Sequence, residues 1–309
     1  AAGGGGRRDL HAVVALIALA GAGGNGEVPA RARGGHDPGQ RQENKADLSK
    51  LALAVWRHAE PFAGTLADRY MRELGLDDYD TYYQQLVTGA TESRAMEWST
   101  LVDRLTVQET SFFRHPGSFA LVEDYLGQFA AERGTGATLN AWSVGCSTGE
   151  EAYSLAMLIS ERFRAHGKAL FYGITGTDIS LPTLAKARRG LFPRRRVEQI
   201  DPALRERYFK DADTHTMQVA DGLRERVCFA HLNVLNLDQA PMDDMDLIFC
   251  QNMLIYFRRW RKRQIVNQLA GRLAPGGLLV LGPGEITDWH DPRLERVHFA
   301  DTLAFRRRQ

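Results

Sequence analysis

The chain has few cysteines, and their positions do not favour a disulfide framework or a metal site. Its 309 residues include Cys146, Cys228 and Cys250, with no CxxC pair and no histidine cluster at metal-ligand spacing. We therefore expect reduced thiols and no bound metal. Cys146 and Cys250 fall at the ends of apolar segments, where cysteine ordinarily packs as a small apolar residue.

The chain also lacks an excess of charge. The formal net charge is +1 at pH 7, and 25% of residues are charged, which is ordinary for a globular protein. Nothing in this balance requires a nucleic acid or an acidic membrane as partner. Two local basic runs, residues 188–196 and 258–263, are more typical of solvated helix or loop faces.

A long apolar run is missing as well, although the start of the chain approaches one. Residues 7–24 combine a basic start, an apolar stretch and then small residues, which is the outline of a signal peptide. The stretch is too short to span a bilayer, so no membrane insertion is expected. Residues 21–46 are rich in Gly, Pro and Arg and are typical of a disordered linker.

What the chain does have is two regions of different pattern. From residue 47 to 106, apolar residues recur at helical spacing, and the helix expected over 65–74 ends at Gly75, a residue suited to a helix C-terminus. This pattern predicts a small all-helical domain. From residue 107 onward, apolar strand segments alternate with helices, which predicts an α/β fold with a mostly parallel sheet covered on both faces.

The α/β region is divided into elements by its glycine and proline residues. Pro116 is expected to stop any helix that reaches it, and residues 275–277, Pro-Gly-Gly, are expected to form a turn. The expected strands are 138–146, 169–180, 226–234, 245–254 and 278–282, and the expected helices are 150–163, 182–190 and 263–273.

The residues that follow the first strand point to the kind of ligand. Ligands of open α/β sheets bind beyond the carboxyl ends of the strands, where this chain has a loop, residues 145–149, followed by Glu150 and Glu151. Gly145 and Gly149 allow a ligand to approach the backbone closely, and the next helix offers free N–H groups. The loop lacks the GxGxxG fingerprint and the P-loop lysine, and two carboxylates would repel a pyrophosphate.

Asp178, at the end of the second strand, completes this inference. An acid there can accept hydrogen bonds from ribose hydroxyls, as in dinucleotide-binding folds. Glu151 is assigned to a cationic or hydroxyl-rich ligand group, whereas Glu150 stays open between ligand binding and a structural role at the helix start. A ribose acceptor and a glycine loop without a phosphate cradle favour S-adenosylmethionine over NAD. Because this cofactor is made in the cytoplasm, residues 1–46 are interpreted as a dispensable disordered extension rather than an export signal.

Several long segments resemble a known family. "STGEEAYSLAM" (147–157) and "IFCQNMLIYF" (248–257), in order with "LTVQETSFFRHPGSF", "TDIS", "FAHLNVLNL" and "LAPGGLLVLGPGE", resemble the CheR-type chemotaxis-receptor methyltransferases, over residues 47–305. The resemblance implies a Rossmann-like class I S-adenosylmethionine-dependent methyltransferase domain over 107–309, with a small β-subdomain near 207–230, preceded by the all-helical domain of 47–106.

The resemblance also implies a reaction and its partner. The family esterifies glutamate side chains in the cytoplasmic domain of methyl-accepting chemoreceptors and releases S-adenosylhomocysteine. A cytoplasmic enzyme without nucleic acid as partner is therefore expected, and we expect a monomer. Because the glutamate side chain has an ordinary pKa of about 4.3, it is already ionised at neutral pH and no general base is required. This agrees with a sequence in which we find no Ser-His-Asp or Cys-His arrangement.

Carried over position by position, the resemblance assigns Arg114 and Tyr256 to the reacting end of the site. Arg114 would hold either the substrate glutamate or the carboxylate of the cofactor. The other interpretation of Arg114 is a structural salt bridge, and the other interpretation of Tyr256 is an aromatic ring that packs in the core. Phe112 and Phe113 are expected to pack as a wall, with the Arg114 guanidinium facing the ligand, and His115 is given no role. The expected cofactor contacts, which include the two loop glycines, are Gln108, Thr110, Arg114, Gly145, Gly149, Glu151, Asp178, Asn233, Val234, Gln251 and Asn252.

The chain departs from the family pattern in places that bear on activity and substrate. Gln108 stands where the family usually has Asn, Gln251 where it has Arg, Ala152 where it has Pro, and "GPGE" (282–285) where it has "GHSE". The basic helix that is thought to meet the receptor is less basic here, "DRYMRELGL" (68–76), so electrostatic steering is weaker. This favours a divergent receptor, such as one served by the type IV pilus-associated PilK-like branch.

Two other functions stay open. A nucleic-acid N-methyltransferase would use the basic runs, but the Asn/Asp-Pro-Pro-Tyr/Phe motif that grips a flipped base is missing, since the segment from Asn252 to Tyr256 has no proline and the wrong spacing. A signalling module that binds S-adenosylmethionine but has lost turnover through Gln108 and Gln251 is the other alternative.

Overall fold

The computed structural model describes residues 72–76, 100, 103 and 109–309. The chain divides into two compact units, one of residues 1–107 with 256–258 and one of residues 108–255 with 259–309. In the first unit, the N–H of Gly75 donates to the carbonyl of Arg72 at 3.1 Å, and Gly75 has a φ of 67°. The predicted helix end at Gly75 is therefore confirmed. The other predictions for residues 1–46 and 47–106 lie outside the described residues.

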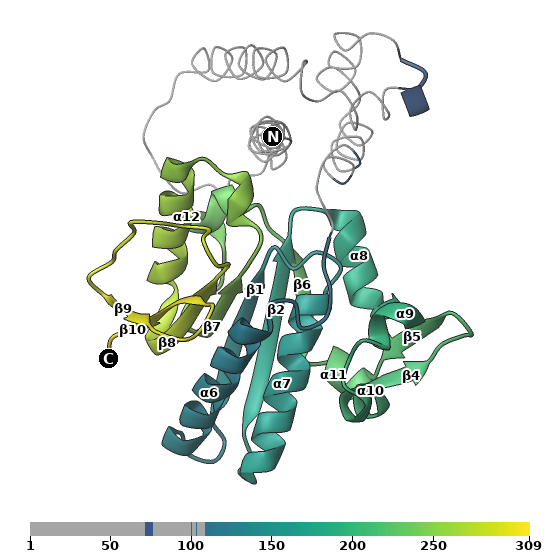
Figure 1. Ribbon diagram of the computed structural model, residues 1–309, viewed down its shortest axis with the longest axis horizontal. Coiled ribbons are helices and arrows are strands. Elements are labelled where there is room, and N and C mark those ends of the chain that lie inside the picture. Colours follow the sequence, from purple (N-terminus) through teal and green to yellow (C-terminus); the bar gives the residue numbers. More distant parts are fainter. Residues whose placement is uncertain (1–71, 77–99, 101–102, 104–108) are drawn as a thin grey trace, which may run out of the picture. The chain divides into compact units, whose positions relative to one another are not determined.

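The second unit is built on a seven-stranded sheet in the order β6-β2-β1-β7-β8-β10-β9 (Figure 1). The first five of these strands are parallel, and β10 and β9 complete the sheet in antiparallel fashion. This is the mostly parallel, Rossmann-like α/β arrangement predicted from the sequence. The strands are β1 (Thr138–Val144), β2 (Phe171–Asp178), β6 (Val227–His231), β7 (Met245–Cys250), β8 (Leu273–Leu281), β9 (Leu294–Val297) and β10 (Leu303–Arg307).

The central strands form because their residues are apolar along their whole length. All six residues of β7 are buried, and so are the last four of β1, as expected of parallel strands that are covered on both faces. The main helices are α6 (Pro116–Glu132), α7 (Glu150–His166), α8 (Leu181–Arg189) and α12 (Arg259–Gly271). Among the described residues, no helix is both long and apolar enough to cross a membrane.

Helix α6 is missing from the predicted helices, because Pro116 was expected only to stop a helix that reaches it. Pro116 is instead the first residue of α6, a position where the N–H that proline lacks would have no helical partner and where its fixed φ suits the helix. Helix α6 lies beside α7 (Figure 1), and its Phe119 ring packs 5.2 Å from the ring of Phe249 in β7. The apolar residues of α6 therefore pack in the core, although the proline before them prevented the helix from being predicted from the sequence.

The predicted turn at residues 275–277 is also wrong in part, because these residues lie inside β8. The pairing shifts there from Met245–Leu273 to Leu247–Leu278, so the segment is a bulge in the strand. Gly276 has a φ of 77°, and a Cβ on Gly277 would lie 2.7 Å from the carbonyl oxygen of Met245. Glycine is required by this close approach of the two strands.

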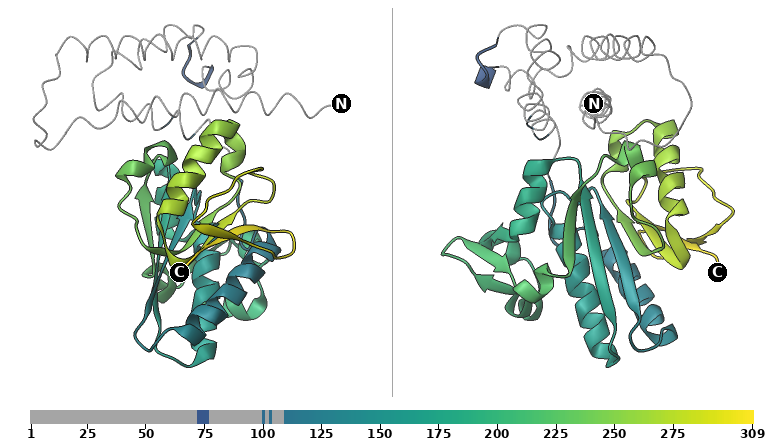
Figure 2. Two further views of the ribbon diagram at one scale, coloured as in Figure 1. Left: turned by 90° about the vertical axis from the view of Figure 1, so that its left-hand side faces the viewer. Right: turned by 180° about the vertical axis from the view of Figure 1, so that it is seen from behind.

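A separate three-stranded antiparallel sheet, which we call the small sheet, has the order β3-β5-β4. It begins earlier than the β-subdomain expected near 207–230, and the end of that range is β6 of the large sheet. The small sheet lies beyond the β6 side of the large sheet, away from β9 and β10 (Figures 1 and 2). Its elements are β3 (Leu191–Pro193), α9 (Arg194–Val197), α10 (Pro202–Tyr208), β4 (Phe209–Asp211), β5 (Thr216–Val219) and the adjoining α11 (Asp221–Arg224).

Candidate cofactor-binding site

The parallel strands bring the predicted site residues to one edge of the sheet. Strands β1, β2, β6 and β7 run in the same direction, so their carboxyl ends share an edge (Figure 1). The segments that follow these ends are residues 145–149, Asp178 with 179–180, 232–234 and 251–253. This is the edge at which open α/β sheets bind ligands.

The loop after β1, residues 145–149, is fixed to the end of β2. The N–H groups of Gly145 and Cys146 both donate to the carbonyl of Thr177, at 2.8 and 2.9 Å. The N–H of Ser147 donates to Oδ2 of Asp178 at 2.9 Å. Gly145 and Ser147 have φ values of 74° and 50°, a left-handed conformation that turns the chain sharply from strand to helix. The loop is therefore preorganised by β2.

Asp178 has a second acceptor role in addition to holding the loop. Its Oδ1 accepts a hydrogen bond from the N–H of Ser180 at 3.0 Å. Burial raises the pKa of Asp178, while the hydrogen bonds from Ser180 and Ser147 act in the opposite direction. Each carboxylate oxygen has two lone pairs, so Asp178 can still accept hydrogen bonds from the hydroxyls of a ribose.

Ser147 is a site residue that the sequence reasoning missed. Its Oγ is buried and has no hydrogen-bond partner among the described residues. Buried polar atoms are nearly always hydrogen-bonded, and leaving one unpaired is costly. Because Ser147 lies between the two loop glycines and next to Asp178, a polar ligand at this edge would supply the missing partner. The donor set therefore fits a nucleoside better than an apolar ligand.

Glu151 is the acid that burial perturbs most clearly. Its pKa is raised to about 8, and burial is the largest cause. The nearby Glu285 carboxylate also raises this pKa. The Ser143 hydroxyl, which donates a hydrogen bond to Glu151 at 2.6 Å, and the Arg114 guanidinium both lower it. A carboxyl group in this state is well suited to meet a cation or a hydroxyl, which would stabilise its charged form.

Glu150, which the sequence left open, has a structural partner. Its side chain is fully buried, and its Oε1 accepts a hydrogen bond from Arg196 of α9 at 2.6 Å. The Thr148 hydroxyl donates to Oε2 at 2.5 Å. Both oxygens of Glu150 thus have protein partners, whereas the neighbouring Glu151 has a partner for one. The structure supports the structural alternative for Glu150.

The segment that precedes α6 contains the expected wall of rings. The Phe112 ring packs edge-on against Phe192 and Phe209 of the small sheet, at 4.9 and 5.5 Å. Phe113 packs 5.2 Å from Phe119, and its N–H donates to Oγ of Ser154 in α7 at 3.0 Å. The expectation that both rings pack is confirmed.

Arg114 follows this wall and is half-buried. Its guanidinium donates to the carbonyl of Glu109 at 2.7 Å, and its charge lowers the pKa of Glu151. Within residues 109–309, no carboxylate lies at ion-pair distance from Arg114, so the described part of the chain does not supply the structural salt bridge considered above. An arginine without an acid partner, close to a ligand-binding loop, is free to bind an anionic group.

The loop after β7 separates Gln251 from Asn252. Gln251 is buried, and its amide N–H groups donate to Oγ of Ser118 at 2.6 Å and to the carbonyl of Leu281 at 3.3 Å. Its side chain thus joins β7 to α6 and β8, which leaves only its carbonyl oxygen for a ligand. Asn252 has a φ of 58°, and its Oδ1 lies 3.1 Å from Nε2 of His115. His115, given no role in the sequence reasoning, therefore holds a predicted site residue.

Of the remaining predicted residues, Asn233 and Val234 follow the end of β6 at the same edge. Asn233 is buried, and its Oδ1 accepts a hydrogen bond from the N–H of Leu235, so it caps the turn Val234–Gln239. Thr110 is half-buried, and Gln108 lies outside the described residues. Tyr256 is half-buried and ends the turn Leu254–Tyr256, but it belongs to the first unit.

The two loop glycines are required by protein contacts. Gly149 has a φ of 95°, and a Cβ there would lie 3.0 Å from Cβ of Ala187 in α8 and 3.1 Å from Cζ of Phe229 in β6. A Cβ on Gly145 would lie 3.0 Å from Cγ of Met253. The sequence predicted that a ligand approaches the backbone closely at these two glycines. In the structure, side chains of the protein itself lie close to them.

Glu285 is a further buried acid near this edge. Its Oε2 accepts a hydrogen bond from the N–H of Gly282 at 2.8 Å, and its Oε1 accepts one from the N–H of Ile255 at 3.2 Å. Burial raises the pKa of Glu285. This residue, the last of the "GPGE" segment, joins the end of β8 to the loop after β7.

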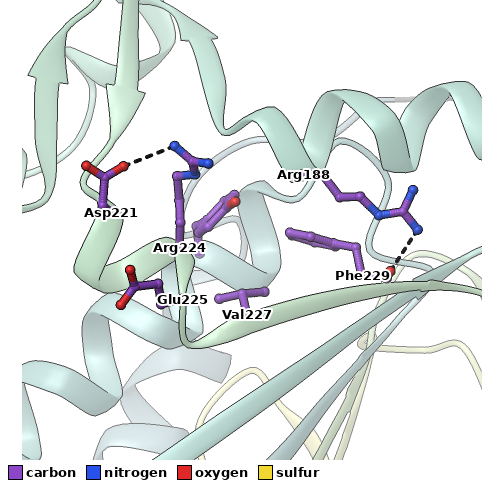
Figure 3. Close-up of a pocket in the computed structure, with 7 residues that line it drawn as sticks. Arg188, Asp221, Arg224, Glu225, Val227 and Phe229 are labelled. Atoms are coloured by element: carbon purple, nitrogen blue, oxygen red, sulfur yellow. Dashed lines mark hydrogen bonds and ion pairs between the residues drawn. The ribbon is translucent and has the colours of Figure 1, made fainter.

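A pocket of about 270 Å³ lies elsewhere, where α8, α11 and β6 meet (Figure 3). Arg224 pairs with Asp221 at 3.1 Å, and Arg188 donates to the carbonyl of Phe229 at 2.8 Å. Since both arginines have partners and acids lie beside them, this pocket has no excess positive charge. In the described part of the chain, no three His, Cys, Asp or Glu side chains are grouped as metal ligands.

Comparison with known proteins agrees with this geometry. A family model described as CheR methyltransferase, SAM binding domain, matches residues 108–302. The chemotaxis protein methyltransferase of Escherichia coli (strain K12) is 32% identical over 221 residues, which are 70% of this chain and 73% of that protein. The protein of the same name from Vibrio parahaemolyticus is 36% identical over 60% of this chain and 66% of its own length.

Other relatives are matched over less of their length. The probable biofilm formation methyltransferase WspC of Pseudomonas putida is 33% identical over 73% of this chain and 52% of its own length. An uncharacterized 104.1 kDa protein of Rhodobacter capsulatus is 32% identical over 72% of this chain, but only 23% of that protein is covered. The solved structure of a TehB-like SAM-dependent methyltransferase from Corynebacterium glutamicum has a TM-score of 0.35 and 14% identity over 70% of this chain and 97% of that one, a likeness too low to support a functional argument.

Proposed function

The chain belongs to the CheR methyltransferase family, and from this premise we propose that it transfers the methyl group of S-adenosylmethionine to glutamate side chains of a chemoreceptor. The observation that carries the proposal is the loop after β1, which Asp178 holds in place and which presents the buried, unpaired Oγ of Ser147. A nucleoside would satisfy Ser147 and use the remaining lone pairs of Asp178.

The residues at this edge divide between the parts of the cofactor. Asp178 would accept the ribose hydroxyls, and Glu151 a cationic or hydroxyl group. Asn252, held by His115, and the backbone near Asn233 and Val234 would form the rest of the cofactor site, with the Gly145 loop beneath it. Thr110 and Gln108 belong to the segment that leads to Arg114, and Gln251 would act through its position more than through its amide.

The cofactor supplies an electrophilic methyl group on a positively charged sulfur. The substrate carboxylate is already ionised at neutral pH, so the protein has no proton to remove. The chemistry that the cofactor would supply is the transfer of this methyl group to one carboxylate oxygen, with the electron pair of the sulfur–carbon bond left on sulfur. Arg114 would orient a carboxylate for in-line attack. Because the charges of both reactants are neutralised, a cleft that excludes water favours the reaction.

The relatives named for chemotaxis support a chemoreceptor as the substrate. We propose that the enzyme is a cytoplasmic monomer that acts on the cytoplasmic domain of a methyl-accepting chemoreceptor. Tyr256 is proposed beside the transferring methyl. The weakly basic segment 68–76 motivates the narrower hypothesis of a pilus-associated receptor. The alternative of a nucleic-acid substrate is not favoured, since Arg194 and Arg196 of the basic run 188–196 are paired with acids of the protein itself.

A transfer assay tests the proposal. The full chain is incubated with methyl-labelled S-adenosylmethionine and purified cytoplasmic fragments of candidate chemoreceptors, with an unrelated acidic helical protein as control. We expect label on the receptor that mild alkali releases, as for an ester. Label that resists alkali, label on nucleic acid, or cofactor binding without transfer to any receptor fragment would contradict the proposed reaction.

A further inference from the structure

Three consecutive arginines after β3 have three different environments. Arg194 pairs with Asp211 of β4 at 2.6 Å, and its backbone N–H donates to the carbonyl of His215. Arg195 is exposed. Arg196 donates to Oε1 of Glu150, the first residue of α7, at 2.6 Å. The run that reads as one basic face in the sequence therefore contains one residue, Arg196, that contacts the residue following the loop of residues 145–149.

Glu150 makes this contact consequential, because its side chain is fully buried whereas that of Arg196 is 40% exposed. Its other oxygen accepts a hydrogen bond from the hydroxyl of Thr148, which lies between Ser147 and Gly149. Removing one partner of a buried ion pair leaves an uncompensated charge, which the structure relieves by moving. A displaced Glu150 would release Thr148 and, with it, the loop that presents Ser147.

We propose that Arg196 is a positioning residue for the cofactor: through Glu150 and Thr148 it sets the loop of residues 145–149, and so couples the small sheet to cofactor affinity. This inference depends on the proposed function, because it assumes that the cofactor binds beside this loop. Arg196 itself need not touch the cofactor.

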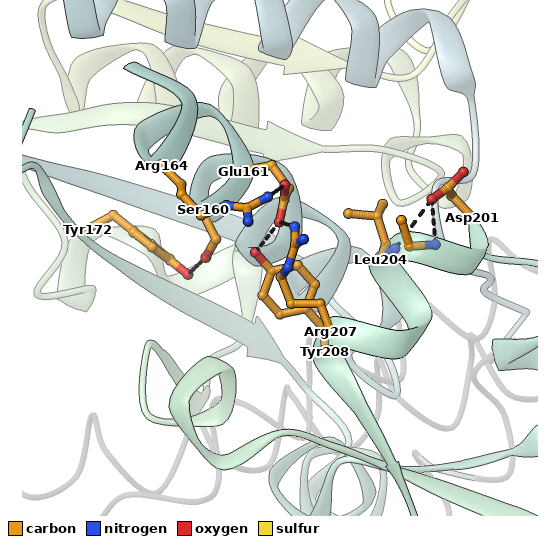
Figure 4. A network of polar contacts seen from close by, with 9 residues as sticks. Ser160, Glu161, Arg164, Tyr172, Asp201, Leu204, Arg207 and Tyr208 are labelled. Carbon is orange, nitrogen blue, oxygen red and sulfur yellow. Dashed lines mark hydrogen bonds and ion pairs between the residues drawn. The ribbon is translucent and has the colours of Figure 1, made fainter. Parts of the chain in front are cut away.

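The small sheet has other attachments, so loss of the Arg196 contact does not detach it. The Phe112 ring packs against Phe192 and Phe209. Farther along α7, Glu161 accepts hydrogen bonds from Arg207 at 2.6 Å and from the Tyr208 hydroxyl at 2.5 Å (Figure 4).

These two attachments of α7 lie well apart. Glu150 and Glu161 are eleven positions apart in α7, a distance of about 16 Å along the helix axis. Only the first attachment includes the cofactor loop, whereas the second involves side chains of α7 and α10 alone (Figure 4). The two contacts can therefore be disrupted separately, and the second serves as a control for the first.

The experiment measures the dissociation constant of S-adenosylhomocysteine by calorimetry on the full chain, with thermal unfolding recorded for each variant. Arg196→Ala is compared with Arg195→Ala, the exposed neighbour, and with Arg207→Ala, which loosens the small sheet at its distant attachment. We expect Arg196→Ala to weaken binding on the order of tenfold, as for directly coupled side chains. The two control variants should bind like the wild type.

Two further variants separate positioning from loss of structure. Arg196→Lys, which keeps the charge, should recover part of the affinity. Adding Glu150→Gln to Arg196→Ala removes the unpaired charge and should also recover affinity. If Arg196→Ala binds like Arg195→Ala, or if Arg207→Ala weakens binding equally, the coupling is refuted while the proposed function stands. If the wild type itself does not bind S-adenosylhomocysteine, the proposed function fails, and the coupling fails with it.

Discussion

The backbone N–H of Ser147 donates a hydrogen bond to Oδ2 of Asp178 at 2.9 Å, so the acid at the end of β2 organises the loop at the end of β1. Asp178 thereby preorganises the loop, and in the proposed function it also accepts hydrogen bonds from the ligand's hydroxyls. The unpaired Oγ of Ser147 completes this arrangement. The site is thus assembled by the sheet before a ligand arrives.

Substitution of Asp178 tests this double role. Asp178→Ala should weaken binding of S-adenosylhomocysteine by about 1–3 kcal/mol, because a charged hydrogen-bonding partner is lost and the loop is released. Calorimetry provides the measurement, and Asp124→Ala, an exposed acid on α6, is the control. Wild-type affinity in the Asp178 variant would remove Asp178 from the cofactor site.

Substitution of Arg114 tests the reacting end. Arg114→Ala should lower the rate of methyl transfer by at least about 100-fold, the usual effect of losing one preorganised charged group. The fold should survive, because the only hydrogen bond described for Arg114 goes to a backbone carbonyl on a partly exposed segment. Circular dichroism and a labelled-methyl assay measure both properties, with Arg133→Ala, an exposed arginine, as the matched variant. Unchanged turnover would assign Arg114 a structural role.

The raised pKa of Glu151 leads to a specific prediction for how the stability of the protein depends on pH. The pKa of Glu151 in the folded protein is about 8, above the value of about 4.3 for an unfolded chain. The folded state therefore retains a proton that the unfolded state has lost, and the stability that Glu151 contributes is full below about pH 4 and is lost progressively as pH rises toward 8.

Because Asp178 and Glu285 also have raised pKa values, the effect of Glu151 is measured as a difference. Glu151→Gln cannot ionise, so the free energy of unfolding of this variant relative to the wild type should increase between about pH 5 and pH 8. Urea denaturation at several pH values provides the measurement. A difference that does not change with pH would show that the surroundings of Glu151 do not raise its pKa.

Gly149 and Gly136 form a matched pair for the packing of the loop. Their φ values are 95° and 89°, but a Cβ on Gly136 would meet no atom within 4 Å, whereas one on Gly149 would crowd Ala187 and Phe229. Alanine at either position costs about 1–2 kcal/mol of backbone strain. Gly149→Ala should cost roughly 1–3 kcal/mol more because of overpacking. Equal losses of stability in urea would contradict the packing described.

The parallel sheet could be predicted because its strands are apolar and are separated by glycine turns and helices. Helix α6 could not, since Pro116 is compatible with a helix start as well as a stop. The small sheet has strands of three or four residues, too short for an alternating pattern to be recognised, so its bounds were misplaced.

The positions of Asp178 and Glu151 in the fold could be predicted, because Asp178 ends β2 and Glu151 follows the loop after β1. Ser147 had a signal that was not used, a polar residue between two glycines of a strand-end loop. The contact of His115 with Asn252 and the pair of Glu150 with Arg196 had no signal in the sequence. Their partners are separated by 137 and 46 positions along the chain and meet only when it folds. Gln251 was assigned to the cofactor site by resemblance. Its hydrogen bond to Ser118 could not be predicted, because Ser118 belongs to α6, which was not predicted.

The most direct test of the account is a crystal structure of the protein with S-adenosylhomocysteine. We predict that the nucleoside lies beside residues 145–151, with its ribose hydroxyls at hydrogen-bond distance from Asp178 and a polar group of the ligand paired with Oγ of Ser147. A nucleoside bound anywhere else, such as the pocket between α8, α11 and β6, would contradict the account.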